Sequence, residues 1–342
     1  MISSTLEHLL RQRHLTREEA SVLMDAIVSG ELGDAQIAAV IVALRAKGET
    51  VDEIAGFVSS LRDKVIRVSA ARQDLVDTCG TGGDGTHTFN ISTAAALVAA
   101  GAGVAIAKHG NRALSSQCGS ADVLDALGIE NVAPDRVGEV IDRAGIGFMF
   151  APAHHPALKH AAAARKALGV RTVFNLLGPM ANPAFVRRQL VGVFDPALTE
   201  TVAKVLHSLG SERVFVVHGS DGSDEVTIAG ETRVTSLDNG HITTFTFVPE
   251  SVGISRADAR VLLGGSPAEN AKSISSILDG TKGPRRDAVV LNAGFVIAVA
   301  GRAESIQEGV TMAAEAIDSG RARVVLDNLR TITNHISDRV PS

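Results

Sequence analysis

The sequence predicts an α/β protein, with a small helical domain at the N-terminus and a large α/β domain around a mainly parallel central sheet. Two observations support this. Up to about residue 70, apolar residues recur at helical spacing between helix-start signals. From about residue 72, short apolar runs alternate with longer Ala-rich segments, as strands and crossover helices do in a parallel sheet. The 342 residues are enough for two such domains.

The first region is predicted to consist of short amphipathic helices. The segments from Thr16 to Glu19 and from Thr50 to Glu53 fit the capping-box pattern that marks helix starts. Asp34 stands where it can cap a helix whose apolar residues recur over residues 37–44. Helices this short are marginal alone, so we expect their apolar faces to pack against one another or against a second subunit.

The second region is predicted to alternate strands and helices. The strand candidates are Leu75 to Asp77, Val104 to Ala107, Gly147 to Phe150, Leu190 to Phe194 and Val214 to Val217. The helix candidates are Ser92 to Ala100, Ser120 to Leu127, Pro156 to Leu168 and Thr199 to Leu209. The stretch from Thr227 to Phe247 is rich in Thr and Val and has turn signals at Gly230 and Asn239-Gly240, which predicts a small antiparallel addition.

Composition and charge argue against several classes of function. The net charge of −5 does not favour nucleic acid or an acidic membrane as a partner, because proteins that follow phosphate backbones usually carry excess Lys and Arg. The longest apolar runs fall short of the ~20 residues that a membrane span needs. Cys79 and Cys118 lack metal-ligand spacing, and the start of the chain has no signal-peptide pattern, so we expect a reduced, cytoplasmic setting.

The segment from Asp77 to Gly85 is the first candidate binding site. Four glycines in six positions follow a predicted strand, and such a backbone can turn tightly and direct N–H groups at a phosphate. The segment from Thr88 to Thr93 then leads into a helix whose first N–H groups favour an anion. Glycine-rich turns between strand and helix are also common without a ligand, and the spacing is not that of a Lys-bearing P-loop.

A second polar segment, from Lys108 to Ser120, also follows a predicted strand. It packs two cations, amides and hydroxyls into one loop, which is suitable chemistry for a polyanion. The alternative is a solvated loop in which Ser120 is the N-cap of the next helix. Capping and binding are compatible, so both interpretations stay open for Ser120.

These segments together resemble the anthranilate phosphoribosyltransferase family. The similar blocks run in order along residues 1–330, which makes the resemblance specific. They are Gly80 to Asp84, Asn90 to Thr93, Lys108 to Arg112, His155 to Lys159, Arg165 to Thr172, Phe174 to Pro183, His218-Gly219, Asp221 to Glu225, Arg285 to Ala288 and Leu291 to Gly294.

The resemblance implies roles for particular residues. The phosphoribosyl donor would be held by Gly80, Gly83, Asp84, Thr88, Asn90, Ile91, Ser92, Thr93, Lys108, His109, Gly110, Asn111, Arg112, Ala113, Leu114, Ser115, Ser116 and Ser120. Anthranilate would contact Gly80, Asn111 and Arg165, with Arg165 facing its carboxylate. Magnesium would be bound by Ser92, Asp224 and Glu225.

The resemblance also implies an architecture and a reaction. Residues 1–70, with a returning segment at about 165–185, would form the helical domain, and residues 71–342 the phosphoribosyl-binding domain. The protein would be a homodimer through the helical domain. It would transfer the phosphoribosyl group of 5-phosphoribosyl 1-pyrophosphate to the amine of anthranilate with Mg²⁺, the second step of tryptophan biosynthesis from chorismate.

Several residues also have plain structural interpretations. Asp221 to Glu225 can be a polar turn, although Asp224 and Glu225 are hard oxygen ligands of the kind Mg²⁺ prefers. Arg165 can be a surface charge, although its fork suits a carboxylate. His154 and His155 precede a proline and are more often structural than catalytic in such a place.

Two other functions are compatible with parts of the sequence. A nucleoside phosphorylase of the related fold would cleave nucleosides with phosphate, but the Lys108 to Arg112 loop and Arg165 favour the anthranilate-type enzyme. A non-catalytic relative that binds nucleic acid would need a basic groove, which the net charge of −5 does not favour.

Overall fold

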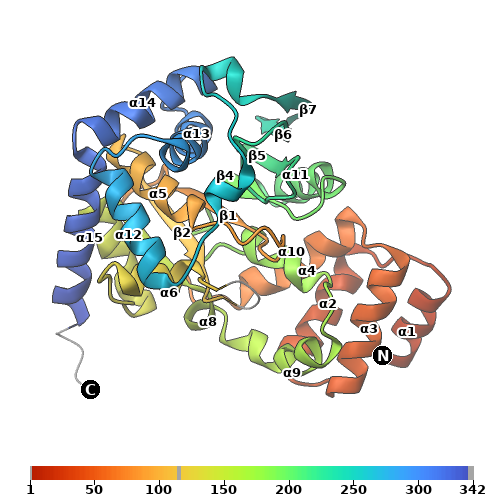
Figure 1. The fold of residues 1–342 in the computed structure, drawn as a ribbon. Helices are drawn as coiled ribbons and strands as arrows, with labels where there is room; N and C mark the ends of the chain where they lie inside the picture. Colours follow the sequence, from red (N-terminus) through yellow and green to blue (C-terminus); the bar gives the residue numbers. More distant parts are fainter. Residues whose placement is uncertain (1, 114–116, 338–342) are drawn as a thin grey trace.

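Four N-terminal helices pack together at one end of the structure, a computed structural model that describes residues 2–113 and 117–337 (Figure 1). They are α1 (Ile2–Leu10), α2 (Arg17–Val28), α3 (Asp34–Lys47) and α4 (Val51–Asp63). Both predicted capping boxes form, at Thr16 with Glu19 and at Thr50 with Glu53. The cap predicted for Asp34 is wrong: Gly33, in extended backbone, is the N-cap of α3, and its N–H donates to the Gln36 side chain.

The two capping boxes differ in burial. The Thr16 box is exposed, whereas Glu53 is fully buried in the bundle. Glu53 accepts hydrogen bonds from the backbone N–H groups of Leu15 at 2.9 Å and Thr50 at 2.8 Å, and it pairs with Lys47 at 2.8 Å. Burial by itself raises the pKa of Glu53, but these donors outweigh it, so the net pKa is below its usual value. The carboxylate therefore ties three parts of the bundle together.

A seven-stranded sheet forms the centre of the larger unit, in the order β3-β2-β1-β4-β5-β6-β7. Neighbouring strands from β3 to β5 are parallel, and β6 and β7 form the predicted antiparallel addition. The strands are β1 (Val76–Gly80), β2 (Ile106–Gly110), β3 (Ile146–Phe150), β4 (Arg188–Gly192), β5 (Arg213–Gly219), β6 (Thr232–Asp238) and β7 (His241–Phe247). The prediction of a mainly parallel central sheet is confirmed.

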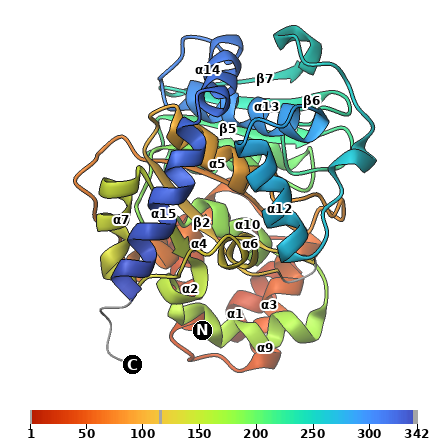
Figure 2. The same ribbon diagram turned by 60° about the vertical axis from the view of Figure 1, so that its left-hand side comes forward.

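Helices cover both faces of the sheet (Figures 1 and 2). Side chains alternate along β5, so that Val214 and Val216 pack with α11 and the bundle, while Val217 packs with α5 and α13 on the other face. The helices after β1 are α5 (Ile91–Gly101), α6 (Ser120–Ala126), α7 (Val137–Ala144), α8 (Ala151–His154), α9 (Lys159–Leu168), α10 (Phe174–Met180), α11 (Leu198–Ser208), α12 (Pro267–Leu278), α13 (Pro284–Val299), α14 (Ile306–Asp318) and α15 (Arg321–Ser337). Short 3₁₀ turns lie at Pro134–Arg136, Pro156–Leu158, Pro249–Val252 and Ala259–Leu262, so the helix predicted from Pro156 begins as a separate turn. None of the described helices is both long and apolar enough to cross a membrane.

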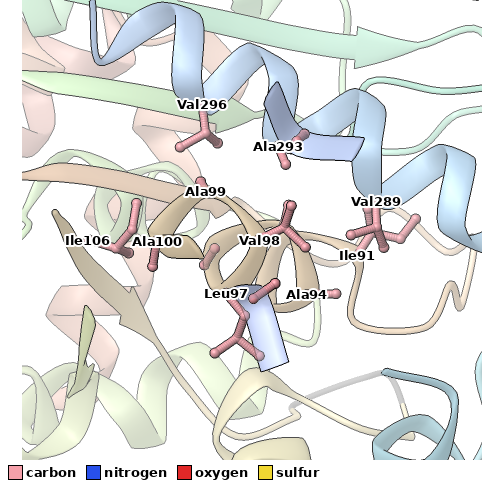
Figure 3. Packing of buried hydrophobic residues seen from close by; sticks show 14 of the residues in the cluster. Ile91, Ala94, Leu97, Val98, Ala99, Ala100, Ile106, Val289, Ala293 and Val296 are labelled. Atoms are coloured by element: carbon pink, nitrogen blue, oxygen red, sulfur yellow. The ribbon is translucent and has the colours of Figure 1, made fainter. Parts of the chain in front are cut away.

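The largest apolar cluster surrounds α5, the helix that follows the glycine-rich segment. Figure 3 shows Val98 and Ala99 of α5 beneath Ala293 and Val296 of α13. Helix α15 also approaches α5 closely, because a Cβ atom on Gly101 would lie 2.7 Å from the backbone nitrogen of Ala322. The packing fixes the N-terminus of α5 at the carboxyl end of β1.

The chain returns to the helical bundle between β3 and β4. Ala161 and Ala164 of α9 are buried against the bundle, where α9 contacts α2 and α3. Helix α10 contacts α4, and Arg62 of α4 donates through Nε to the Met180 carbonyl at 2.9 Å. Residues carried by this segment are therefore positioned by the bundle as well as by the sheet.

Candidate active site

A cavity of about 470 Å³ opens where β1 and β2 end and α10 faces them. The edge formed by the carboxyl ends of parallel strands is the usual ligand site in open α/β sheets. The lining residues are Cys79, Gly80, Thr81, Gly82, Gly83, Asp84, Gly85, His87, Thr88, Phe89, Asn90, Ile91, Ser92, Thr93, Lys108, His109, Gly110, Asn111, Arg112, Ala113, Cys118, Gly119, Ser120, Ala151, Arg165, Phe174, Asn175, Gly178, Pro179, Asp224 and Glu225.

The glycine loop after β1 forms one wall. Gly82 and Gly83 have φ angles of +64° and +67°, a backbone region that side chains disfavour. The N–H of Gly82 donates to Asp224 Oδ2 at 2.7 Å. A Cβ atom on Gly80 would lie 2.1 Å from the same carboxylate oxygen. The loop needs glycine both for its turn and for the close approach of Asp224.

The floor of the cavity is polar and buried. Lys108, which is 3% exposed, donates through Nζ to the Thr78 carbonyl at 2.6 Å and to Ser92 Oγ at 3.4 Å. Asp77 accepts from the His109 N–H at 3.1 Å and from Asn182 Nδ2 at 2.7 Å. Burial raises the pKa of Asp77, and the Lys108 charge opposes that rise. The bonds to Thr78 and Ser92 hold the Lys108 ammonium at the base of the site.

Three carboxylates gather beside the glycine loop. The Asp224 N–H donates to Asp84 Oδ2 at 3.3 Å, and the Ser92 N–H donates to Glu225 Oε1 at 3.1 Å. Burial, and then the neighbouring Asp84, raise the pKa of Asp224 to about 7. Burial and Asp224 likewise raise the pKa of Glu225 well above its usual value. Such mutual repulsion is relieved by a bound cation.

The donor set fits a hard cation that keeps part of its coordination for a ligand. The described residues contain no group of three or more His, Cys, Asp or Glu side chains arranged to hold a metal. Asp224, Glu225 and the Ser92 hydroxyl offer oxygen atoms only. Mg²⁺ commonly binds to one or two carboxylates and completes its shell with phosphate oxygens and water.

The loop after β2 is tied to α6. Arg112 pairs with Asp122 at 2.8 Å and with Asp125 at 2.7 Å, so much of its charge is already compensated. Ser120 is not the N-cap of α6. Gly119 holds that position with its N–H bonded to Asp122, while Ser120 Oγ donates to the Asn111 carbonyl at 3.1 Å.

The opposite wall comes from the returning segment. Arg165 of α9 has its guanidinium 5.2 Å from the centre of the Phe174 ring, and burial lowers its pKa. Asn175 accepts from the Thr172 N–H at 3.0 Å, which fixes the start of α10. A partly desolvated guanidinium without a carboxylate partner among the described residues favours an anionic ligand.

Two buried histidines stand behind this wall. The rings of His109 and His155 are 5.1 Å apart, and His109 Nδ1 lies 3.2 Å from the Gly178 carbonyl. Burial, and then His155, lower the pKa of His109 to about 3. Burial, and then His154, lower the pKa of His155 to about 4. Both rings are neutral near pH 7, and His155 does not line the cavity.

The structure brings together almost all the residues named from the sequence. Every predicted donor, anthranilate and metal residue that it describes lines the one cavity. Leu114, Ser115 and Ser116 lie outside the described residues. Sequence reasoning assigned no role to the lining residues Phe174, Asn175, Gly178 and Pro179, although they fall in a block that carried the family resemblance.

Comparison with known proteins shows which family the chain belongs to. Residues 3–65 match the helical bundle domain, and residues 72–323 the α/β domain, of a glycosyl transferase family. The anthranilate phosphoribosyltransferase of Moorella thermoacetica is 53% identical over 327 residues, which cover 95% of this chain and 96% of that protein. The chain belongs to the anthranilate phosphoribosyltransferase family.

Solved structures of the anthranilate phosphoribosyltransferase family share the whole fold. The enzyme from Thermus thermophilus superimposes with a TM-score of 0.92 at 44% identity, covering 96% of this chain and 99% of that chain. The enzyme from Saccharomyces cerevisiae, in complex with PRPP and Mg, gives a TM-score of 0.90 at 27% identity and covers 98% of each chain. The predicted fold class and family resemblance are confirmed.

Proposed function

We propose that this protein transfers the phosphoribosyl group of 5-phosphoribosyl 1-pyrophosphate to the amine of anthranilate, giving N-(5-phosphoribosyl)anthranilate and pyrophosphate in tryptophan biosynthesis. The observation that carries the proposal is that a glycine loop, a carboxylate pair and Arg165 surround one cavity. The yeast relative in complex with PRPP and Mg supports the identity of the donor and the metal.

The donor is assigned to the wall formed by the loops after β1 and β2. The N–H groups of the glycine loop and the dipole at the N-terminus of α5 are suited to phosphate oxygens. Lys108 stands below them, and Asn111 and Ser120 lie at the second loop. We propose that the full set of residues named from the sequence, including Leu114, Ser115 and Ser116, binds the donor.

Magnesium is assigned to Ser92, Asp224 and Glu225. When bound there, Mg²⁺ supplies positive charge to the pyrophosphate oxygens. The residues of this chain fix its place: the Gly82 N–H orients Asp224, and the Ser92 N–H orients Glu225.

Anthranilate is assigned to the wall of Arg165, with Gly80 and Asn111 at its amine end. The guanidinium of Arg165 would pair with the carboxylate of the acceptor. An aryl amine near neutral pH carries a free lone pair, so the reaction needs no strong base. The neutral state of His109 and His155 is consistent with this, because neither has the pKa of a general base poised near pH 7.

The chemical step forms a bond from the amine nitrogen to the anomeric carbon and breaks the bond from that carbon to the pyrophosphate oxygen. The bonding pair leaves with pyrophosphate, and the nitrogen then loses a proton. Lys108 and the loop amides would stabilise the growing negative charge. We also propose that residues 1–70 and 165–185 move as one unit against the rest, which would align the two substrates.

Loss of anthranilate fluorescence tests the proposal. Purified protein, 5-phosphoribosyl 1-pyrophosphate and Mg²⁺ should together abolish the signal, and each omission should preserve it. Phosphorolysis of thymidine and uridine is the control for a nucleoside phosphorylase. Persistent fluorescence with folded protein that binds the donor would assign the site to another acceptor.

We also propose that the protein forms a homodimer through the helical bundle and works in the cytoplasm. Leu10, Val22 and Val42 on the first three helices are large apolar side chains that the single chain leaves exposed. Light scattering after size-exclusion chromatography should give twice the chain mass, and Val42→Glu should lower it. A monomeric wild type would contradict this assembly.

A further inference from the structure

Arg171 is a cation without a polar partner, in the link between α9 and α10. Its side chain is exposed, and its guanidinium lies 4.5 Å from the centre of the Phe194 ring. It makes no hydrogen bond or ion pair with any described residue. Stacking on a ring leaves the N–H groups at the edge of the guanidinium free to bind an anion.

The guanidinium stands beside the glycine loop. A Cβ atom on Gly83 would lie 3.7 Å from Arg171 Nε. The supporting ring is itself tied to that loop, because the Phe194 N–H donates to Thr81 Oγ1 at 3.1 Å and the Thr81 N–H donates to the Gly192 carbonyl at 3.0 Å. Arg171 is therefore positioned at the rim of the cavity, next to N–H groups that suit phosphate.

The charges that line the cavity leave a need for such a cation. The lining cations are Lys108, Arg112 and Arg165, and the lining carboxylates are Asp84, Asp224 and Glu225, so their formal charges cancel. Arg112 is already paired with Asp122 and Asp125. A ligand that carries a pyrophosphate adds several negative charges, and a further cation close to them would stabilise them in addition to Mg²⁺ and the loop N–H groups.

We propose that Arg171 binds the pyrophosphate end of the phosphoribosyl donor at the rim of the cavity, beside Gly83. This inference rests on the proposed function. Arg171 belongs to the segment that carries Arg165, so its contact with the donor would also draw the acceptor wall toward the glycine loop. Arg171 would therefore contribute both to donor affinity and to alignment of the second substrate.

The test compares Arg171→Ala with Lys166→Ala, which removes another exposed cation of the same segment. Arg171, and not Lys166, is a near neighbour of Gly83. For Arg171→Ala the donor KM should rise about 10- to 100-fold, the loss expected for a hydrogen bond to a charged group. The anthranilate KM should change less than the donor KM. Arg171→Lys should recover part of the donor affinity, and Lys166→Ala should behave as wild type.

Two further measurements separate binding from packing. Raising the salt concentration should weaken donor binding less in Arg171→Ala than in wild type, because one screened charge contact is gone. Phe194→Leu removes the stacked ring but keeps the charge, so its donor KM should rise less than that of Arg171→Ala. An equal rise in both variants, with an unchanged salt response, would overturn the proposal in favour of packing.

Calorimetry with 5-phosphoribosyl 1-pyrophosphate and Mg²⁺, without acceptor, distinguishes this inference from the proposed function. Wild type that binds the donor while Arg171→Ala binds it equally well would refute the role of Arg171 alone. Wild type that binds no donor would refute the proposed function and this inference together. Weaker donor binding by Arg171→Ala supports the inference even if transfer to anthranilate is not observed.

Discussion

The two walls of the cavity are built by different means. The wall at the ends of β1 and β2 consists largely of backbone, with glycine N–H groups and the buried Lys108 held by the sheet and by α5. The wall opposite consists of side chains from α9 and α10, including Arg165, and these helices pack on the N-terminal bundle. The sheet positions the first wall, whereas the position of the second wall depends on its packing against the bundle.

This difference predicts that damage to the two walls has different signatures. A change in the sheet wall should affect the donor, the metal and the chemical step. A change in the bundle should affect stability and the acceptor more than the donor, to which the returning segment contributes only the contact proposed for Arg171. The following substitutions test that contrast.

The largest effect is expected from the carboxylates of the sheet wall. Asp224→Asn combined with Glu225→Gln should lower kcat/KM for the donor about 10³-fold, since metal-borne charge stabilisation is worth several kcal/mol. Steady-state rates across a magnesium titration measure this. Glu250→Gln, at an exposed ion pair, is the control. Unchanged turnover and magnesium dependence in the double variant would remove the metal from this site.

The next effect concerns the bundle. Glu53→Gln leaves the Lys47 ammonium buried without its partner and should lower the free energy of unfolding by about 3 kcal/mol. Glu19→Gln, in the matching but exposed capping box, should cost only about 0.5 kcal/mol. Urea denaturation measures both, and the KM for anthranilate should rise more than that for the donor in Glu53→Gln.

The sign of the pH effect follows from the lowered pKa of Glu53. Its stabilisation is present above the unfolded-state pKa, near the usual value of 4.5, and is lost as pH falls through the lower folded value. The difference between wild type and Glu53→Gln should therefore be full at pH 7 and shrink as the solution becomes acidic below about pH 4.5. A difference that grows on acidification would contradict the ion pair.

A smaller, selective effect is expected at Arg165. Arg165→Ala should raise the KM for anthranilate about 10- to 100-fold, because one charge-assisted contact is lost, while the donor KM stays within about twofold. Arg165→Lys should recover only part of the loss, because an ammonium cannot bind a carboxylate through a fork. Equal changes in both KM values would show that Arg165 supports the whole cavity and does not select the acceptor.

The smallest effect is on the stability of the metal-free protein. The pKa of Asp224 is raised to about 7 in the folded protein, so the folded state binds this proton more tightly than the unfolded state does. The stabilisation from the protonated carboxyl is therefore present at low pH and is lost as the pH rises toward 7. Asp224→Asn should therefore melt a few degrees above wild type at pH 8 without metal and show little difference at pH 4. Differential scanning calorimetry measures it, and added Mg²⁺ with the donor should stabilise wild type more than the variant.

The local features of this protein can be predicted from its amino-acid sequence. Helix caps at Thr16 and Thr50, the strand before the glycine loop and the antiparallel hairpin near its Asn239-Gly240 turn depend on residues a few positions apart, so pattern and propensity suffice for them. The ordered family blocks also contained most of the residues that line the cavity. Where two neighbouring residues compete for one local role, as Gly33 with Asp34 or Gly119 with Ser120, composition alone favoured the wrong cap.

Which distant groups come into contact depends on the packing of the whole chain. The Gly82 N–H and the Asp224 carboxylate are 142 residues apart in the chain, and Asp77 and Asn182 are 105 apart. The position of Arg171 beside Gly83 and the burial of Glu53 likewise depend on how α9, α10 and the bundle pack. Local periodicity specifies which face of an element is apolar, but the order of the strands and the packing of the helices set the pKa of each carboxylate and the partner of each cation.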